Sequence, residues 1–177
     1  MERKEEKRRE IRIFLSSTLR NLNDKRTYLM DVVFPELIRI CRERDLFLTV
    51  VDSRWGISNP DDESIISHVM DVCFREIERA RPFFIGILAG RYGHVPRDDK
   101  KKTSEELERW ERDATKRKWF EEGYSITHIE MEYGVLSKPD MANYSYFYFK
   151  SVKSTDDRDK KEEHSRRLEE LKNKISI

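Results

Sequence analysis

The stretch that most constrains the fold is Ile11-Arg-Ile-Phe-Leu-Ser-Ser-Thr18, an apolar, β-prone run that ends in three hydroxyl residues. A polar helix start, Asn21-Leu-Asn-Asp24, follows almost at once. This pattern is typical of a buried parallel strand that leads into a helix, with its small polar residues at the carboxyl end. Ligands of open α/β sheets bind at these carboxyl ends. We therefore expect a strand over 11–15 and a site next to its end.

Strand-like and helix-like patterns alternate along the rest of the chain. Strands are predicted over 46–51, 83–88 and 144–149, and helices over about 24–44, from the acidic cluster at 61–63 to about 80, from 125 or 127 to before 139, and over 161–174. Right-handed crossovers between such elements build a parallel, doubly wound sheet. The fold class is therefore α/β, with four to five parallel strands and helices on both faces.

The first predicted helix contains a proline within an apolar pattern. Pro35 should kink the helix or divide it into two shorter ones. Seven apolar positions recur at helical spacing and predict one buried face: Tyr28, Leu29, Val32, Val33, Leu37, Ile38 and Cys41.

Composition limits the function classes. Lys and Arg total 36 against 35 Asp and Glu, so a net charge of +1 gives no case for nucleic-acid or membrane binding. Cys41 and Cys73 fit helical apolar patterns, the four histidines share no metal-ligand spacing, and no signal peptide is evident, so we expect a cytoplasmic protein without a metal site. We expect a charged tail over 1–10 and one domain over 11–177, interrupted by a polar insertion at about 97–124. A fifth strand would be expected after the last helix, so we expect the chain to be a fragment of a longer multidomain protein.

Five motifs occur in an order that resembles a known family. They are Phe14-Leu-Ser-Ser-Thr18, Val33-Phe-Pro-Glu-Leu37, Asp52-Ser-Arg-Trp-Gly56, Phe84-Ile-Gly-Ile-Leu88 with Gly90-Arg-Tyr-Gly93, and Ser125-Ile-Thr-His-Ile-Glu130. Together they resemble the TIR-like (DUF4062-type) domain near the N-terminus of large NACHT-ATPase proteins with WD or TPR repeats, a group that includes telomerase-associated protein, nephrocystin and NACHT-and-WD-repeat proteins. The resemblance covers about 11–175, with Ser53 where relatives tend to have Leu and His128 where they often have an acidic residue.

The resemblance implies a flavodoxin-like (TIR-like) fold and a place in multidomain signalling or scaffold proteins, with innate immunity as one setting. TIR domains more widely either self-associate and bind protein partners, or hydrolyse NAD with a Glu on the helix after the third strand, a position that Glu130 matches. The first interpretation is a signalling and interaction domain of a NACHT-type STAND ATPase, with no certain cofactor. The alternative is an NAD nucleosidase that uses Glu130, with NAD as its substrate.

Glu130 has two interpretations from the residues alone. A carboxylate in a cleft stabilises the oxocarbenium-like charge that forms when nicotinamide leaves a ribose. Thr127-x-x-Glu130 also matches a capping box, in which Glu130 only satisfies the backbone N–H of Thr127. Enzyme function requires Glu130 to face an open cleft, free of capping.

The other candidate residues lie in loops at the carboxyl ends of the predicted strands. Ser16 and Ser17 either bind a phosphate or cap the helix entry. Asp52, Arg54 and Trp55 either bind a ligand or partner, or form an Asp52–Arg54 pair beside a Trp folded onto the sheet. Arg91 and Tyr92 either face the same cleft or form a turn whose Tyr packs inward. The interaction hypothesis expects exposed apolar groups around Trp55 or on the second helix, whereas a structural remnant would show neither feature.

Overall fold

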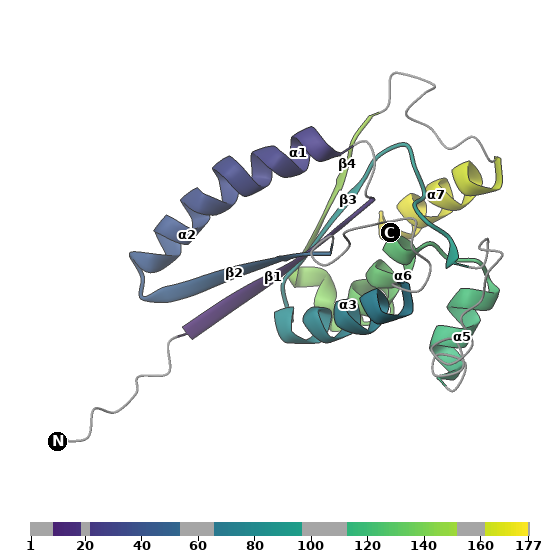
Figure 1. Cartoon of the computed structure of the whole chain (residues 1–177), viewed down its shortest axis with the longest axis horizontal. Helices are drawn as coiled ribbons and strands as arrows, with labels where there is room; N and C mark the ends of the chain where they lie inside the picture. Colours follow the sequence, from purple (N-terminus) through teal and green to yellow (C-terminus); the bar gives the residue numbers. More distant parts are fainter. Residues whose placement is uncertain (1–8, 19–21, 54–65, 97–112, 152–161, 177) are drawn as a thin grey trace.

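The computed structural model describes residues 9–18, 22–53, 66–96, 113–151 and 162–176. Four strands, β1 (Arg9–Ser17), β2 (Leu46–Asp52), β3 (Phe84–Leu88) and β4 (Ser145–Phe149), form one sheet in the order β2-β1-β3-β4. All three neighbouring pairs are parallel. Figure 1 shows this twisted sheet with helices on both sides, so the predicted doubly wound α/β fold, consistent with a flavodoxin-like arrangement, is confirmed.

Helices alternate with the strands as the sequence predicts. They are α1 (Asn23–Tyr28), α2 (Phe34–Arg42), α3 (Ile66–Ala80), α5 (Ala114–Glu121), α6 (Ile126–Met131) and α7 (Glu162–Ile175). Two π-helical turns, η1 (Leu29–Val33) and η4 (Glu132–Leu136), and a 3-10 segment, η5 (Pro139–Tyr144), complete the described elements. In the part of the chain that the structure describes, no helix has both the length and the apolar character needed to cross a membrane.

Pro35 does not divide the first predicted helix, because the backbone stays helical from α1 through η1 into α2. It lies at the start of α2, directly after the π-helical turn η1. Proline has no N–H to donate to the preceding turn, and the hydrogen-bond pattern of the helix changes at this point through the π-helical turn.

The prediction of one buried face on this helix is wrong at three positions. Tyr28, Val32 and Leu37 are exposed, while Leu29 and Ile38 pack against the core. A π-helical turn spaces its hydrogen bonds by five residues, so a stripe drawn at 3.6 residues per turn does not continue along one side of the helix.

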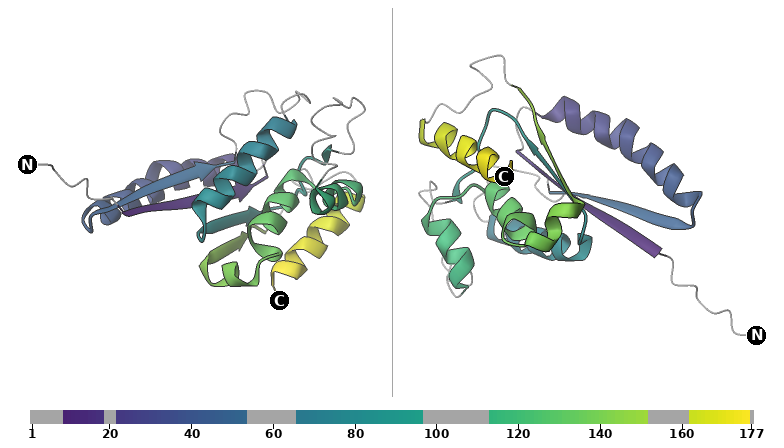
Figure 2. Two further views of the ribbon diagram at one scale, coloured as in Figure 1. Left: turned by 90° about the horizontal axis from the view of Figure 1, so that it is seen from below. Right: turned by 180° about the vertical axis from the view of Figure 1, so that it is seen from behind.

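The two faces of the sheet have separate cores, and Figure 2 shows helices on either side of the strands. Below α1 and α2 the buried residues come chiefly from β1, β2 and β3: Leu15, Leu22, Phe34, Leu48, Val50, Ile87 and Ala89. On the opposite face, rings from three neighbouring strands pack in a row, with centroids 5.7 Å apart for Phe14 and Phe84 and 6.0 Å apart for Phe84 and Phe147. Helices α3, α6 and α7 cover this aromatic row.

Gly86 leaves room for the aromatic row. A Cβ at this position would lie only 2.5 Å from the ring of Phe147. Any larger residue on β3 would displace the ring that β4 contributes to the core, so the glycine is a packing requirement of this face.

The described part of the predicted insertion contains α5. Trp119 on α5 is buried against Met70 and Phe74 of α3 and Ile129 of α6. Asp113 caps the helix by accepting hydrogen bonds from the backbone N–H groups of Thr115 and Lys116. Trp119 therefore anchors this segment, whereas Trp110 lies outside the described residues.

Candidate functional site

The carboxyl ends of β1 and β2 hold a cluster of buried polar side chains. Ser16, Ser17 and Thr18 at the end of β1 are buried, and so are Asp52 and Ser53 at the end of β2. Ser53 donates its backbone N–H to the carbonyl of Leu15 over 3.1 Å, which continues the pairing of the two strands past β2. Because buried polar groups need partners, the contacts of these side chains decide what the cluster does.

Arg26 of α1 reaches this edge and is the partner of Asp52. Its guanidinium is 0% exposed and forms a two-pronged ion pair with the Asp52 carboxylate, which includes an Nε to Oδ2 hydrogen bond of 3.2 Å. The same guanidinium donates to the hydroxyl of Ser17. Arg26 thus links the ends of β1 and β2 to the first helix.

Glu130 of α6 is buried behind the end of β1. The side chain of Ser16 donates a hydrogen bond to its carboxylate, and the thiol of Cys73 on α3 is a second partner. Burial raises the pKa of Glu130 to about 7, against the lowering effects of Ser16, Cys73 and the nearby charge of Arg26. Burial, with the charge of Glu130, also raises the pKa of Cys73, so the thiol stays protonated and able to donate.

The capping-box interpretation of Glu130 is wrong. The N-cap of α6 is Ser125, whose hydroxyl accepts the backbone N–H of His128 over 3.2 Å. Glu130 lies five residues beyond that cap and faces β1 and α3. It is also only 2% exposed, so it is free of capping but does not face solvent in an open cleft.

A second buried chain of polar groups runs from β3 to α6. The hydroxyl of Tyr92 and Nδ1 of His128 are 2.6 Å apart, and Nε2 of His128 lies 3.3 Å from Oε1 of Glu132. The imidazole also stacks on the ring of Tyr124, with centroids 3.8 Å apart and an angle of 6° between planes. Burial lowers the pKa of His128 and raises the pKa of Tyr92 to about 12, so both groups are neutral at pH 7.

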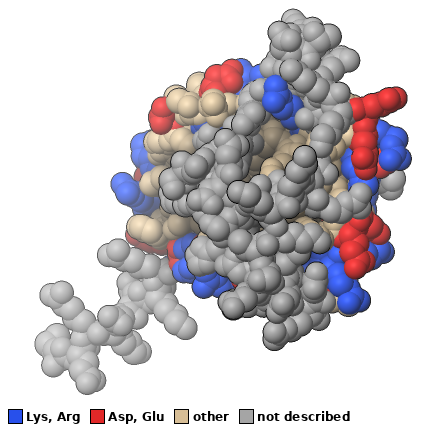
Figure 3. All heavy atoms as spheres, turned by 45° about the vertical axis from the view of Figure 1, so that its right-hand side comes forward, with Lys and Arg blue, Asp and Glu red and all other residues tan. Residues whose placement is uncertain are grey.

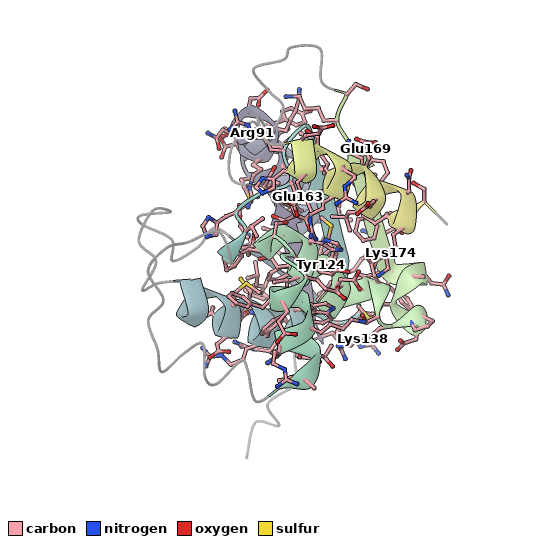
Figure 4. The ribbon with its side chains drawn as sticks, turned by 90° about the vertical axis from the view of Figure 1, so that its right-hand side faces the viewer. Arg91, Tyr124, Lys138, Glu163, Glu169 and Lys174 are labelled. Carbon is pink, nitrogen blue, oxygen red and sulfur yellow. The ribbon has the colours of Figure 1, made fainter. Side chains whose placement is uncertain are left out.

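This second chain holds α7 against the domain. Lys174 of α7 donates to the carboxylate of Glu132, and Arg167 of α7 contacts Tyr92. Burial alone would raise the pKa of Glu132, but the hydrogen bonds from His128 and Lys174 outweigh it and lower the pKa. Figure 4 shows Lys174 and Tyr124 on the side of the molecule where α7 lies next to α6. Each of these side chains contacts another of the group, so the arrangement docks α7 onto the rest of the domain.

The structure separates the predicted site residues into three groups. Ser16, Ser17, Asp52 and Glu130 do come together at the carboxyl ends of the strands, as buried partners of Arg26 and Cys73. Tyr92 lies apart from them, fully buried between α6 and α7, and Arg91 is half-buried. Arg54 and Trp55 lie outside the described residues, so their predicted roles stay predictions.

Two members of the cluster were not singled out from the sequence. Arg26 lies four residues after Leu22 and three before Leu29, on the apolar stripe of its helix, and an arginine on such a stripe indicates a buried ion pair. Cys73 fits a helical apolar pattern so well that its hydrogen bond to Glu130 leaves no mark in the sequence.

Charge and metal ligands do not define a site in the described part of the chain. In Figure 3, basic and acidic side chains alternate around the visible face instead of gathering in one patch. Among the described residues, no group of three His, Cys, Asp or Glu side chains is arranged to hold a metal ion.

The described surface has one other unusual feature, on β4. We use the name tyrosine face for Tyr146 and Tyr148 of β4 together with Tyr144, the last residue of η5. Tyr146 and Tyr148 alternate with Phe147 and point away from the aromatic row, and the ring of Tyr144 lies edge-on to Phe83 with centroids 6.1 Å apart. Tyr146 is 59% exposed and Tyr148 is 58% exposed. Tyr146 and Tyr148 stand level with Ile85 and Ile87 of β3, on the side of the sheet that α1 and α2 cover only over β1, β2 and β3. Among the described elements, no helix covers this half of the sheet face.

Within the described side chains of the second helix, residues 70 to 80, there are no exposed apolar groups of the kind that the interaction hypothesis expected. Val72 is half-buried, and the other apolar side chains are buried: Met70, Cys73, Phe74, Ile77 and Ala80. The loop around Trp55 lies outside the described residues. The exposed large apolar side chains are found instead on β4 and at the end of η5, at Phe47 of β2, and on the outer side of α1, η1 and α2.

Comparison with known proteins identifies the family. The model of the Domain of unknown function (DUF4062) matches residues 12–177, so the chain belongs to the DUF4062 family. No solved structure matches it at a significant level.

The curated relatives are much longer proteins with repeats. A TPR repeat-containing protein of Dictyostelium discoideum is 31% identical over 147 residues, which is 80% of this chain and 8% of that protein. Telomerase protein component 1 of Mus musculus is 38% identical over 88 residues, 50% of this chain and 3% of its own length. NACHT and WD repeat domain-containing protein 2 of Mus musculus is 29% identical over 93 residues, 49% of this chain and 5% of its own length. The chain thus spans less than a tenth of each of these relatives.

Proposed function

We propose that this chain is a protein-interaction domain of a large NACHT- or TPR-type repeat protein, and that it binds other proteins through the tyrosine face. The relatives are named for NACHT, WD and TPR segments, and this chain corresponds to a small part of each. A small domain attached to a long repeat protein is well suited to bringing that protein to its partners.

The observation that carries the proposal is the open half of the sheet. Tyrosine is enriched at protein interfaces, because its ring supplies a large apolar area while its hydroxyl remains hydrated before binding. Tyr146 and Tyr148 of β4 and Tyr144 just before it are exposed at alternate positions along the chain, which differs from the single exposed apolar side chains that any surface carries.

The state of the polar cluster also supports an interaction role. The predicted ligand-binding groups Ser16, Ser17 and Asp52 already donate to or accept from Glu130 and Arg26. A ligand would have to compete with these buried contacts, each of which satisfies a group that is costly to leave unpaired.

Photo-crosslinking tests the interaction role. A photoreactive phenylalanine analogue replaces Tyr148 in one version of the chain and Tyr28 in another, since Tyr28 on α1 is 59% exposed and serves as the matched control. We expect protein adducts from position 148 and few from position 28, with the chain expressed in the context of its repeat protein. Equal yields at the two positions, or none at 148, would contradict the proposal.

A second candidate function is NAD cleavage by Glu130. The observation that favours it is a buried carboxyl with a pKa of about 7 at the carboxyl end of the sheet, because strongly shifted carboxyl groups are common in active sites. In this mechanism Ser16 would have to release Glu130 so that the carboxylate could face the ribose. The mechanism therefore requires an opening at the end of β1.

NAD consumption by the concentrated chain, alongside Glu130→Gln, tests this candidate. Turnover that is lost in a Glu130→Gln variant with an unchanged circular dichroism spectrum would establish the enzyme. Ser16→Ala is the matched second variant, since it removes the hydrogen bond that occupies the carboxylate and should preserve or raise the turnover. Absence of turnover in both the parent chain and Ser16→Ala would exclude the candidate.

A further inference from the structure

The contact that docks α7 places two nitrogen groups on one oxygen of a buried carboxylate. Oε1 of Glu132 lies 3.3 Å from Nε2 of His128, one helical turn earlier, and accepts a hydrogen bond from Nζ of Lys174 on α7 (Figure 4). Ser137 donates to the other oxygen, Oε2, over 3.2 Å. The side chain of Glu132 is only 3% exposed, so its charge is balanced by these partners and hardly by water.

The chemistry of the partners fixes the protons on His128. A carboxylate only accepts hydrogen bonds, so Nε2 carries the proton, and Nδ1 accepts from the hydroxyl of Tyr92, 2.6 Å away. The imidazole is therefore neutral, with both nitrogens occupied. Because a neutral ring leaves the charge of Glu132 uncompensated, the cation that balances this charge is Lys174 of α7.

We propose that His128 and Lys174 compete for the charge of Glu132, so that protonation of His128 releases α7 from the rest of the domain. A protonated His128 balances the carboxylate from one turn away on its own helix, and Lys174 then brings a surplus charge. The inference goes beyond the proposed interaction function and does not depend on the tyrosine face. Histidine suits this role because its ordinary pKa lies close to neutral pH.

The cations that α7 brings to this contact oppose a charge on His128. Lys174 and Arg167 each act to lower the pKa of His128, and Arg167 also contacts Tyr92. Glu163 pairs with Arg167 over 3.1 Å, but the side chain of Glu163 is 56% exposed, so water screens its charge. A proton on His128 therefore places a third positive charge beside two that belong to α7.

The groups that face His128 from the rest of the domain do not offer a second negative charge. Burial raises the pKa of both Tyr92 and Tyr124, so the two rings against the imidazole are neutral at pH 7. Glu122 is a hydrogen-bond partner of Tyr124 and not of His128. Among the described residues, Glu132 is the one carboxylate in contact with the imidazole, so the competition is for a single charge.

The pH dependence of docking follows from these contacts. With α7 docked, burial and then the two cations of α7 lower the pKa of His128 below its ordinary 6.5, against the raising effect of Glu132. Release of α7 removes the cations, so the released state binds the proton more tightly. Docking is therefore strongest above about pH 7 and weakens as the pH falls through 6.5.

Hydrogen exchange of the α7 amides between pH 7.5 and 5.5 tests the release. After correction for the intrinsic exchange rate, we expect the opening constant of α7 to rise roughly tenfold over this range, while that of α2 does not rise. His128→Gln, which stays neutral and can still form hydrogen bonds, should abolish the rise. His164→Gln is the control, because the ring of His164 on α7 lies 5.8 Å from that of Tyr92 and should not matter. No rise in the parent chain, or a rise that persists in His128→Gln, would overturn the proposal.

A titration of the His128 ring by NMR tests the competition without changing the histidine. Lys174→Met keeps the aliphatic stem and removes the cation, so by linkage the midpoint of the His128 titration should move upward by roughly one pH unit. Lys172→Met is the matched control, because Lys172 pairs with Glu169 on the same helix. A midpoint that stays in place in Lys174→Met, or moves equally in both variants, would show that the two side chains do not compete.

Discussion

The carboxyl end of β1 and the exposed face of β4 differ in what their polar and aromatic side chains contact. At the carboxyl end of β1, Ser16, Ser17 and their partners Glu130 and Arg26 are buried and bound to one another. On β4, Tyr146 and Tyr148 are more than half exposed. The polar groups at the end of β1 are of the types that serve in active sites, but they are buried and bind one another within the fold. The side chains on β4 are less reactive, but they are exposed to partners. A list of polar residues at strand ends thus says less about function than the contacts they make.

The contrast is also present within β4 itself. Phe147 packs into the aromatic row, while the tyrosines on either side of it point to the opposite, open face. Because successive strand residues alternate between faces, one five-residue strand both completes a core and presents a surface.

Replacing Arg26 by Met should have the largest effect on stability. The change leaves the buried carboxylate of Asp52 without its partner, and breaking a buried pair in this way costs about 3–5 kcal/mol. Urea unfolding measures the loss. Arg39→Met, which removes an exposed pair with Glu36, should cost less than about 1 kcal/mol.

A double variant separates charge from packing at this pair. Arg26→Met with Asp52→Leu removes both buried charges, so we expect much of the lost stability to return. If Arg26→Met alone costs no more than Arg39→Met, the ion pair does not hold the strand ends together and this part of the account is wrong.

Glu130→Gln should change how stability depends on pH. The folded chain holds the pKa of Glu130 near 7, above its ordinary 4.5, so between these values it binds more protons than the unfolded chain. Stability contributed by this group is therefore present below about pH 4.5 and lost as the pH rises through 7, by about 3 kcal/mol in total.

Denaturant unfolding at a series of pH values checks this, with Glu130→Gln measured beside the parent chain. His128 acts with the opposite sign, because its lowered pKa costs stability as the pH falls below its ordinary 6.5. The difference between the two chains cancels the His128 contribution. A difference that stays constant from pH 4.5 to 7 would show that Glu130 is not held as the structure has it.

Lys174→Ala should loosen α7 selectively. The change removes the cation that α7 places on Glu132 and, since Lys174 is half exposed, we expect a cost of about 1 kcal/mol. Hydrogen exchange should quicken in α7 and remain unchanged in α2. Lys172→Ala is the control, because Lys172 pairs with Glu169 on the same helix. Equal quickening in both variants would mean that the contact with Glu132 does not dock α7.

Tyr146→Ser should have the smallest effect on the stability of the monomer. Exposed substitutions away from caps and buried networks usually change stability by less than about 0.5 kcal/mol, and Tyr28→Ser should behave alike because Tyr28 is equally exposed. Protein adducts from a photoreactive residue at position 148 should fall only with Tyr146→Ser. A large stability loss from Tyr146→Ser would mean that its ring belongs to the fold and is not a free surface.

Much of the fold could be predicted from the sequence, because its patterns are local. The strand predicted over 46–51 is continuously apolar except for Thr49, and the last helix carries Leu168 and Leu171 on a narrow stripe that the structure buries. The exposed side of the first helix could not be predicted, since the π-helical turn before Pro35 breaks the periodicity on which the prediction depends.

The site was predicted less completely, because its contacts join distant segments. The sequence places Ser16, Asp52 and Glu130 at strand ends or on the right helix, but it does not show that Arg26 pairs with Asp52 or that Ser16 pairs with Glu130, 114 positions away. The β-prone run at 144–149 was recognised as a strand. Its exposure depends on which helices cover which strands, and that is a property of the assembled sheet.

Photo-crosslinking from positions 148 and 28, in the context of the repeat protein, is the most direct test of the tyrosine face as a binding surface, because Tyr148 and Tyr28 are almost equally exposed. We predict protein adducts from position 148 and few from position 28. Equal yields at the two positions, or none at 148, would contradict the claim that this domain binds other proteins through the tyrosine face.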